Sequence, residues 1–287
     1  MRVGCVVLTT GERPLELAAA VESAQHQQGV DVEVVVVWNA PTDGPRPEVA
    51  GTRLVEPGEN LGIPAGRNLG VDHLDASCGL VLFLDDDGML VGDDVLARAA
   101  ARFAADPRLG AVSLRIVDPV TGSTERRHVP RLRVGDPARS SWVTTFLGGA
   151  AIVRTAAFRE AGGLPGEFFY AHEETSLAWR LLDLGYRIRY VGELKLAHPA
   201  LPPARHAAYH RLTARNRVLL ARKHLPAVLA VLYVSLWFLL NIARAPEARR
   251  TIVAGFREGL QAPDVDRQPI RWRTVLRMTR YGRPPLL

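Results

Sequence analysis

Residues 79–88 read Gly79-Leu-Val-Leu-Phe-Leu-Asp85-Asp86-Asp87-Gly88, and this stretch decides the fold. Residues 80–84 are apolar without polar alternation, which is typical of a strand buried on both faces of an α/β sheet. Three carboxylates directly after such a strand repel one another and gain nothing from packing. Hard divalent cations such as Mg²⁺ and Mn²⁺ prefer oxygen ligands, and open α/β sheets bind ligands outside the carboxyl ends of their strands. The stretch therefore predicts a metal site beside a phosphorylated ligand; the alternative is a solvated acidic turn.

The sequence around this stretch alternates strand and helix patterns. Runs at 3–8, 32–37 and 80–84 predict strands, and helical patterns at 15–27 and 65–74 lie between them. This order predicts a parallel sheet with right-handed crossovers. Further elements are expected as helices at 93–105, 155–161 and up to Leu184, where Gly185 ends the helix, and as strands at 111–117, 150–154 and 186–191. Residues 118–145 are rich in Pro, Arg, Thr and Ser and are predicted to form a long loop.

Composition narrows the class of protein. The 287 residues are 47% hydrophobic and 23% charged, which fits a folded globular chain with an ample core. Cys5 and Cys78 have no metal-type spacing, so we expect neither a zinc site nor a disulfide framework. The N-terminus enters a strand without a cleavage site, so we expect no signal peptide and a cytoplasmic protein.

Charge divides the chain into an acidic body and a basic C-terminal region. Residues 1–203 carry a formal charge of −6 and residues 204–287 one of +12, which points to an anionic surface as partner of the second part. Residues 227–243 are uncharged and have arginines on both sides, so a helix lying in a membrane interface or docked on the body fits better than a span. Residues 270–283 are amphipathic and suit anionic lipid.

Polar motifs follow the strands in a characteristic order. Thr9-Thr10-Gly-Glu-Arg13 follows the first strand, Trp38-Asn39 the second, and Asn60-Leu-Gly62 with Arg67 comes before the aspartates. Glu173-Glu174 stands at a helix start about 90 residues later. This order resembles the GT-A fold glycosyltransferases of family 2 over roughly residues 2–225. The resemblance implies a Rossmann-like α/β fold with a mostly parallel central sheet flanked by helices, here with a basic helical C-terminal extension.

The resemblance also implies a role for individual residues. Residues 1–203 would form the catalytic domain, with a nucleotide-sugar half at about 1–117 and an acceptor half at about 146–203. Nucleotide-sugar contacts are expected from Thr9, Thr10, Arg13, Asn39, Asn60, Gly62, Arg67, Asp85 and Asp86. Metal ligands are expected from Asp87, Asp85 and His198, and acceptor or sugar contacts from Gly148, Gly149 and Trp142. Glu174 matches the position of the catalytic base, with Glu173 as the alternate.

The expected activity is transfer of a single hexosyl or rhamnosyl group from a nucleotide-diphosphate sugar to a hydroxyl acceptor. Such a reaction needs a cation for the departing diphosphate, a base for the hydroxyl proton, and positioning. The resemblance implies dependence on Mg²⁺ or Mn²⁺ and inversion at the anomeric carbon. The expected acceptor is a cell-envelope or lipid-linked glycan, reached from the cytoplasmic face of the membrane through residues 204–287. No nucleic-acid partner is expected.

Some residues depart from the family pattern and leave alternatives open. Trp38 stands where the family usually has an Asp that pairs with the nucleotide base; Trp could stack on the base but cannot accept that hydrogen bond. Residues 268–272 match the Q-x-x-R-W signature of processive synthases but lie too far from Glu174, so we interpret them as coincidence. Residues 83–88 also resemble the nucleophile motif of haloacid-dehalogenase-type phosphatases, with Asp85 and Asp87 in the active roles. A non-catalytic, membrane-associated binding protein that keeps the fold is the other alternative.

Overall fold

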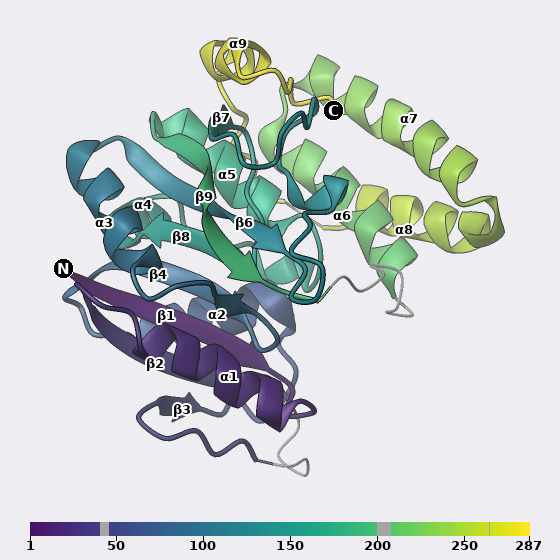
Figure 1. Ribbon diagram of the computed structural model, residues 1–287. Coiled ribbons are helices and arrows are strands. Elements are labelled where there is room, and N and C mark those ends of the chain that lie inside the picture. Colours follow the sequence, from purple (N-terminus) through teal and green to yellow (C-terminus); the bar gives the residue numbers. More distant parts are fainter. Residues whose placement is uncertain (41–45, 200–207, 264) are drawn as a thin grey trace.

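A computed structural model describes residues 1–40, 46–199, 208–263 and 265–287, and their strands form one mixed sheet (Figure 1). The strand order is β3-β2-β1-β4-β8-β6-β9-β5, and β7 pairs with β9 at the side of this path. The strands are β1 (Arg2–Thr9), β2 (Asp31–Trp38), β3 (Arg53–Val55), β4 (Cys78–Asp85), β5 (Met89–Leu90), β6 (Leu109–Val117), β7 (Ser141–Val143), β8 (Ala150–Arg154) and β9 (Arg187–Ala197).

The sheet has a parallel half and a mixed half. β1 runs parallel to both β2 and β4, as the alternation of strands and helices predicts. β8 is antiparallel to β4 and to β6, while β6 and β9 are parallel to each other. An antiparallel neighbour needs no crossover helix, which is why the chain returns from β6 to β8 through residues 118–149. The carboxyl ends of β1, β2 and β4 therefore meet at one edge.

Helices cover both faces of the sheet. α1 (Pro14–Gln25) and α3 (Val95–Ala105) pack on the face that contains Leu82. α2 (Gly62–Asp72), α4 (Thr155–Glu160) and α5 (Glu173–Leu184) pack on the face that contains Phe83. Successive residues of a strand point to opposite faces, so β4 must be apolar throughout to be buried on both. The predicted doubly covered strand is confirmed, and so is the α/β fold class.

Several elements differ from the sequence-based expectation. The predicted long loop contains a short 3₁₀ turn (Arg126–His128) and strand β7, and a second turn (Gly166–Phe168) precedes α5. β9 runs to Ala197, six residues beyond the predicted end, because it pairs with β6 as far as Val117 and also with β5. Neither β3 nor β5 was expected, since strands of three and two residues carry too little pattern to be recognised.

The basic C-terminal region is helical. It contains α6 (Tyr209–His224), α7 (Ala227–Arg244), a 3₁₀ turn (Pro246–Ala248), α8 (Arg249–Gln261) and α9 (Trp272–Arg280). Figure 1 shows α6, α7 and α8 together at the end of the molecule away from β3, and α6 packs against both α7 and α8. Helix α8 was not predicted.

Helix α7 docks on the body by one face only. Tyr233 is 3% exposed, and the ring of Phe238 meets that of Phe256 at 5.2 Å between centroids. Away from these contacts Val231 is 67% and Leu239 66% exposed. The helix has the length and composition to cross a membrane, a property that core helices of soluble proteins share. One docked face and one apolar exposed face fit the interface and docked alternatives.

Candidate active site

One large cavity of about 1070 Å³ lies at the edge where β1, β2 and β4 end, between that edge, α2 and α5. Its lining contains the predicted residues Thr9, Thr10, Arg13, Asn39, Asn60, Gly62, Arg67, Asp85, Asp86, Asp87, Gly149, Glu173, Glu174 and His198. Residues as far apart in the chain as Thr9 and His198 thus meet in one cleft, because parallel strands bring their carboxyl ends to the same edge. Gly148 and Trp142 are the predicted site residues that do not line the cavity.

Asp85, Asp87 and His198 form a group that can bind a metal. Their ligand atoms all lie within 4.8 Å of one another. Nε2 of His198 is 3.0 Å from Oδ1 of Asp87 and 3.9 Å from Oδ2 of Asp85. Carboxylate oxygens with one imidazole nitrogen suit Mn²⁺ and, through the carboxylates, Mg²⁺. The side chains present therefore fit a divalent cation.

The full length of β9 explains the position of His198. The strand pairs with β6 up to Val117, and the amide of His198 donates to the carbonyl of Val117 at 3.0 Å. His198 thus follows the carboxyl end of β9 directly, on the same side of the sheet as the aspartates after β4. The strand predicted from sequence ended at Val191, so the metal role expected of His198 came from the family resemblance alone.

Positive groups surround the aspartates. Burial favours a raised pKa for Asp87, but the hydrogen bond with His198 and the charge of Arg13 outweigh burial and lower the pKa. The pKa of His198 is raised, because hydrogen bonding to Asp87 and the charge of Asp85 outweigh its desolvation. Arg13 forms ion pairs with Asp87 and, at 3.3 Å, with Asp86. The attraction that holds a proton on His198 would equally hold a cation among these oxygens.

Asp86 differs from its two neighbours. It is 5% exposed and accepts a hydrogen bond from Oγ1 of Thr9 at 2.7 Å. Burial raises its pKa, and the bond from Thr9 and the charge of Arg13 oppose that rise. Asp86 thus fastens the loop after β1 to the end of β4, while Asp85 and Asp87 face the metal position.

Two asparagines shape the loop 60–62, which is expected to contact the nucleotide-sugar. Oδ1 of Asn39 accepts from the amide of Leu61 at 2.8 Å, and its Nδ2 donates to the carbonyl of Gly62 at 3.1 Å. Oδ1 of Asn60 accepts from the amide of Gly62 at 2.9 Å. Gly62 has φ +79°, and a Cβ there would collide with the backbone of Phe169, so only glycine fits.

Trp38 is buried beneath this site and does not line the cavity. It is 2% exposed, and its Nε1 lies 3.4 Å from the carbonyl oxygen of Thr10. A ring in that position cannot stack on a nucleotide base, so the possibility raised from the sequence is wrong. The tryptophan instead supports the loop that carries Thr10.

Arg67 connects the two acidic groups of the cavity. It is 2% exposed, its Nη2 donates to Oδ1 of Asp85 at 2.7 Å, and its guanidinium lies 5.7 Å from the centre of the Phe83 ring. Its positive charge also acts to lower the pKa of both Glu173 and Glu174. An arginine buried here is a structural link as well as a candidate phosphate ligand.

Glu173 and Glu174 begin α5 inside the cavity. Burial raises the pKa of both carboxyl groups, and for Glu173 the charge of Glu174 adds to the rise. A Cβ at Gly148 would lie 2.5 Å from Oε1 of Glu174 and from Nη1 of Arg67. Gly148 therefore makes room for the carboxylate without lining the cavity itself. Two adjacent carboxyl groups, one buried and one half-buried, take up a proton more readily than a solvated one, as a general base requires.

Trp142 does not contact this site, which corrects the expectation that it stacks on a sugar there. It lies on β7, its ring stacks on Tyr281 at 6.4 Å between centroids, and the guanidinium groups of Arg187 and Arg189 lie 4.9 and 5.1 Å from its centre. The side chain is thus held between β9 and the C-terminal residues. From the sequence, a tryptophan in a loop gave no sign of these partners.

The segment 268–272 is hydrogen-bonded to α5 and α6. The amide of Gln268 donates to the carbonyl of Lys223, and Arg271 binds Asp183 through its amide at 2.8 Å. Asp183 is at the far end of α5 and does not line the cavity. The segment therefore attaches α9 to α5 and α6, in line with its interpretation as unrelated to the synthase signature.

Sequence reasoning missed other residues that line the cavity, namely Leu8, Glu12, Ile63, residues 169–172, Ala208, Tyr209 and Leu212. Residues 169–172 reach the cavity because of their backbone angles, and their residue types do not predict such angles. Tyr209 and Leu212 belong to α6, which the sequence marked only as a basic helix.

Comparisons with known proteins agree with this architecture. The family model described as glycosyl transferase family 2 matches residues 5–162. The S. aureus TarS 1-349 structure superposes with a TM-score of 0.62 at 15% identity, covering 91% of this chain and 81% of that one. The mannosyltransferase PcManGT from Pyrobaculum calidifontis, solved with GDP-Man and Mn²⁺, gives 0.59 at 24% identity over 91% and 76%.

The limits of these matches are also informative. A longer TarS structure is matched over only 39% of its length, with a TM-score of 0.53 and 18% identity. No curated protein gives a significant match. Identities below 25% show a shared fold alone. The family match, in contrast, covers more than half of the chain and includes the three aspartates, so the protein belongs to glycosyl transferase family 2.

Proposed function

We propose that the protein transfers a single sugar from a nucleotide-diphosphate sugar to a hydroxyl acceptor, with inversion. One observation carries the proposal: the Asp85, Asp87 and His198 group and the Glu173–Glu174 pair line the same cavity. The first group suits a cation and the second suits a proton. Sugar transfer from a nucleotide diphosphate needs both functions within one site.

Each part of the cavity has a role in this proposal. Residues after β1 and the loop 60–62 bind the nucleotide, and Arg67 lies next to the diphosphate. Asp85, Asp87 and His198 would hold Mg²⁺ or Mn²⁺, which when bound neutralises charge on the leaving diphosphate. Glu174, with Glu173 as the alternate, accepts the proton of the acceptor hydroxyl. Attack from the side opposite the leaving group inverts the anomeric carbon in one step.

A lipid-linked or other cell-envelope glycan is the proposed acceptor, reached by peripheral attachment at the cytoplasmic face of the membrane. The support is the exposed apolar face of α7, with Val231 and Leu239, and the charge of +12 on residues 204–287. An apolar helix face beside arginines binds anionic lipid surfaces. Vesicles with and without anionic lipid would test the attachment by co-sedimentation, and Val231→Glu should weaken it.

The donor is proposed to carry a hexosyl or rhamnosyl group. Among structural neighbours, TarS was solved with UDP-GlcNAc and PcManGT with GDP-Man, so both nucleotide types occur on this fold. With Trp38 buried where the family usually has a base-pairing Asp, the nucleotide has to be found by screening. A panel of nucleotide-sugars with Mn²⁺ should reveal the donor by a rise in Tm, since a bound ligand stabilises the folded state.

The decisive experiment is an assay of metal-dependent nucleotide-sugar hydrolysis and transfer. Turnover with Mn²⁺ that is lost in Asp87→Ala and in Glu174→Gln supports the proposal. Phosphate release from a phosphomonoester would instead favour the phosphatase alternative, although neither Lys195 nor Lys223 lines the cavity as that mechanism requires. Donor binding without turnover toward any acceptor would favour a binding protein.

A further inference from the structure

The segment in front of the glutamate pair has an unusual backbone. Phe169, Ala171 and His172 have φ of 61°, 69° and 71°, the only non-glycine residues with positive φ in the described parts of the chain. Such angles are energetically costly for residues with a Cβ. They persist only where surrounding contacts outweigh the cost. We call residues 167–172 the base loop, because Glu173 follows it directly.

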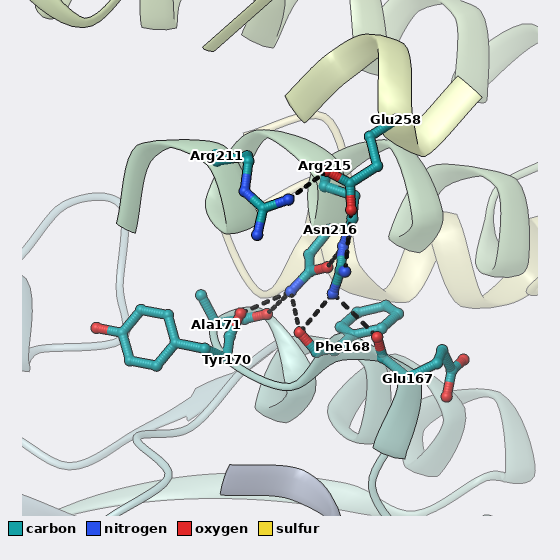
Figure 2. A network of polar contacts seen from close by, with 8 residues as sticks. All are labelled: Glu167, Phe168, Tyr170, Ala171, Arg211, Arg215, Asn216 and Glu258. Carbon is teal, nitrogen blue, oxygen red and sulfur yellow. Dashed lines mark hydrogen bonds and ion pairs between the residues drawn. The ribbon is translucent and has the colours of Figure 1, made fainter. Parts of the chain in front are cut away.

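Asn216 of α6 supplies several of the contacts that hold the base loop. It is 0% exposed, and its Nδ2 lies 2.9, 2.6 and 2.9 Å from the carbonyl oxygens of Phe168, Tyr170 and Ala171 (Figure 2). An amide NH₂ has two hydrogens, so three acceptors share them. The positive φ values of the base loop turn these three carbonyls toward one point. Without that donor, the three carbonyl oxygens would lose the partner that they share.

Arg215 adds a second set of contacts. Its Nη2 donates to the carbonyls of Glu167 at 3.0 Å and Phe168 at 2.8 Å, and its Nε donates to Oδ1 of Asn216 at 3.0 Å. On its other side Glu258 of α8 pairs with Nη1 at 3.3 Å, as Figure 2 shows. The base loop is therefore held from α6, and α6 in turn is held from α8.

The base loop also touches the donor side of the cavity. The carbonyl of Phe169 accepts from the amide of Ile63 at 2.8 Å. Gly62 approaches Phe169 so closely that a Cβ at residue 62 would overlap its backbone. The base loop thus connects the loop 60–62, the glutamate pair and the C-terminal helices.

We propose that Asn216 and Arg215 are positioning residues for the reaction: they hold the base loop and thereby set the place of Glu173 and Glu174 against the metal group. The proposal rests on the proposed function. It makes α6 and α8 part of the active site, although the family match ends at residue 162. A base displaced by about 1 Å loses on the order of a hundredfold in rate, while nucleotide affinity depends on other contacts.

The experiment compares Asn216→Ala and Arg215→Met with a matched control, Arg211→Ala, in the full chain. Arg211 lies on the same helix and pairs with the same Glu258 at 3.0 Å, but it is not bonded to the base loop (Figure 2). Hydrolysis is followed with Mn²⁺ and either UDP-GlcNAc or GDP-mannose, whichever the wild type turns over faster. We expect kcat to fall about a hundredfold in Asn216→Ala and about tenfold in Arg215→Met, with KM within about threefold of wild type. The control should match the wild type.

A second readout separates positioning from general loss of structure and does not depend on turnover. Hydrogen exchange should rise at the amides of residues 167–174 in both variants, remain unchanged in β1 and β4, and remain unchanged everywhere in the control. Wild-type kcat in both variants, or a rise of KM at constant kcat, would overturn the proposal. A wild type without any turnover would sink the proposed function instead, and unchanged exchange at the base loop would then still overturn the role of Asn216.

Discussion

The two acidic groups of the cavity, Asp85–Asp87 after β4 and Glu173–Glu174 at the start of α5, have opposite surroundings. Arg13 and His198 contact the aspartates, and the pKa of Asp87 is lowered. Glu173 is buried and Glu174 half-buried beside it, Arg67 is the positive group that acts on both, and the pKa of each is raised. Asp87 stays ionised, as a metal ligand must, whereas Glu173, with a pKa of about 8, can hold a proton near neutral pH.

This contrast shows how one fold edge supports two kinds of chemistry. The end of β4 and the start of α5 place the two groups in one cavity, but neighbouring charges and burial decide what each can do. Arg67 stands between them, bonded to Asp85 and acting on both glutamates. The contrast predicts different consequences for substitutions that look alike in sequence.

The largest loss is expected from Asp87→Ala. Removing a ligand of the cation forfeits several kcal/mol of charge stabilisation, which corresponds to about a thousandfold or more in turnover. The rise in Tm on adding Mn²⁺ with UDP should disappear as well. Asp93→Ala, an exposed acid beyond the same strand, is the control and should behave like wild type. Full activity in Asp87→Ala would refute the metal site.

Glu174→Gln tests the second group. The amide keeps the size of the side chain but cannot accept the proton, so kcat should fall by about two to three powers of ten while the Tm response to Mn²⁺ and UDP remains. Glu173→Gln is the matched comparison and should lose about tenfold or less. If the two variants exchange these results, Glu173 is the base, and the assignment within the pair is reversed.

Much of the donor half could be predicted from sequence. The run at 80–84 identified a strand buried on both faces, and its aspartates identified a sheet edge with ligand chemistry. These inferences work because strand, turn and motif are local in the chain. The antiparallel course of β8 was not foreseeable, since the loop at 118–145 carries no pattern that sets a strand's direction.

Other parts of the site depend on long-range contacts that sequence does not reveal. The metal role of His198 was predicted from the family resemblance, but its route to Asp85 and Asp87 was not: β9 runs six residues past its predicted end. Trp142 packs against Arg187, Arg189 and Tyr281 instead of lining the cavity, and none of these residues is near it in the chain. Asn216 lies in a basic helix and donates to backbone carbonyl groups. Every residue has such a group, so the sequence does not show which ones Asn216 will bind.

The pH dependence should report the raised pKa values of the glutamate pair. A base must be deprotonated, so a pKa above the ordinary 4.5 moves the acid limb of kcat/KM to higher pH than a solvated glutamate would give. Arg67→Met removes the charge that opposes this rise, so its acid limb should lie at still higher pH, with turnover about tenfold lower. An acid limb at lower pH in this variant would contradict the role given to Arg67.

The smallest effect on activity is expected at the opposite end of α5. Asp183 is 6% exposed and accepts from Oγ1 of Thr274 at 2.7 Å and from the amide of Arg271. Burial favours a raised pKa, but these bonds outweigh it and lower the pKa. Asp183→Ala should reduce the free energy of unfolding by about 1–3 kcal/mol, because it leaves the buried donors unpaired. Turnover below the melting range should stay at the wild-type level.

The pH dependence of that stability difference separates Asp183 from the glutamates. A group whose pKa is lowered on folding stabilises the protein above its ordinary pKa of 3.8 and loses this contribution as pH falls through the folded value. The gap between wild type and Asp183→Ala, measured by urea unfolding, should therefore be full at pH 7 and shrink in acid. For the glutamates, with raised pKa values, the sign is reversed, because their ionised forms are disfavoured by folding at pH 7. One helix thus carries acids of both kinds, and the cavity at its start, rather than the helix itself, decides which of them takes part in the reaction.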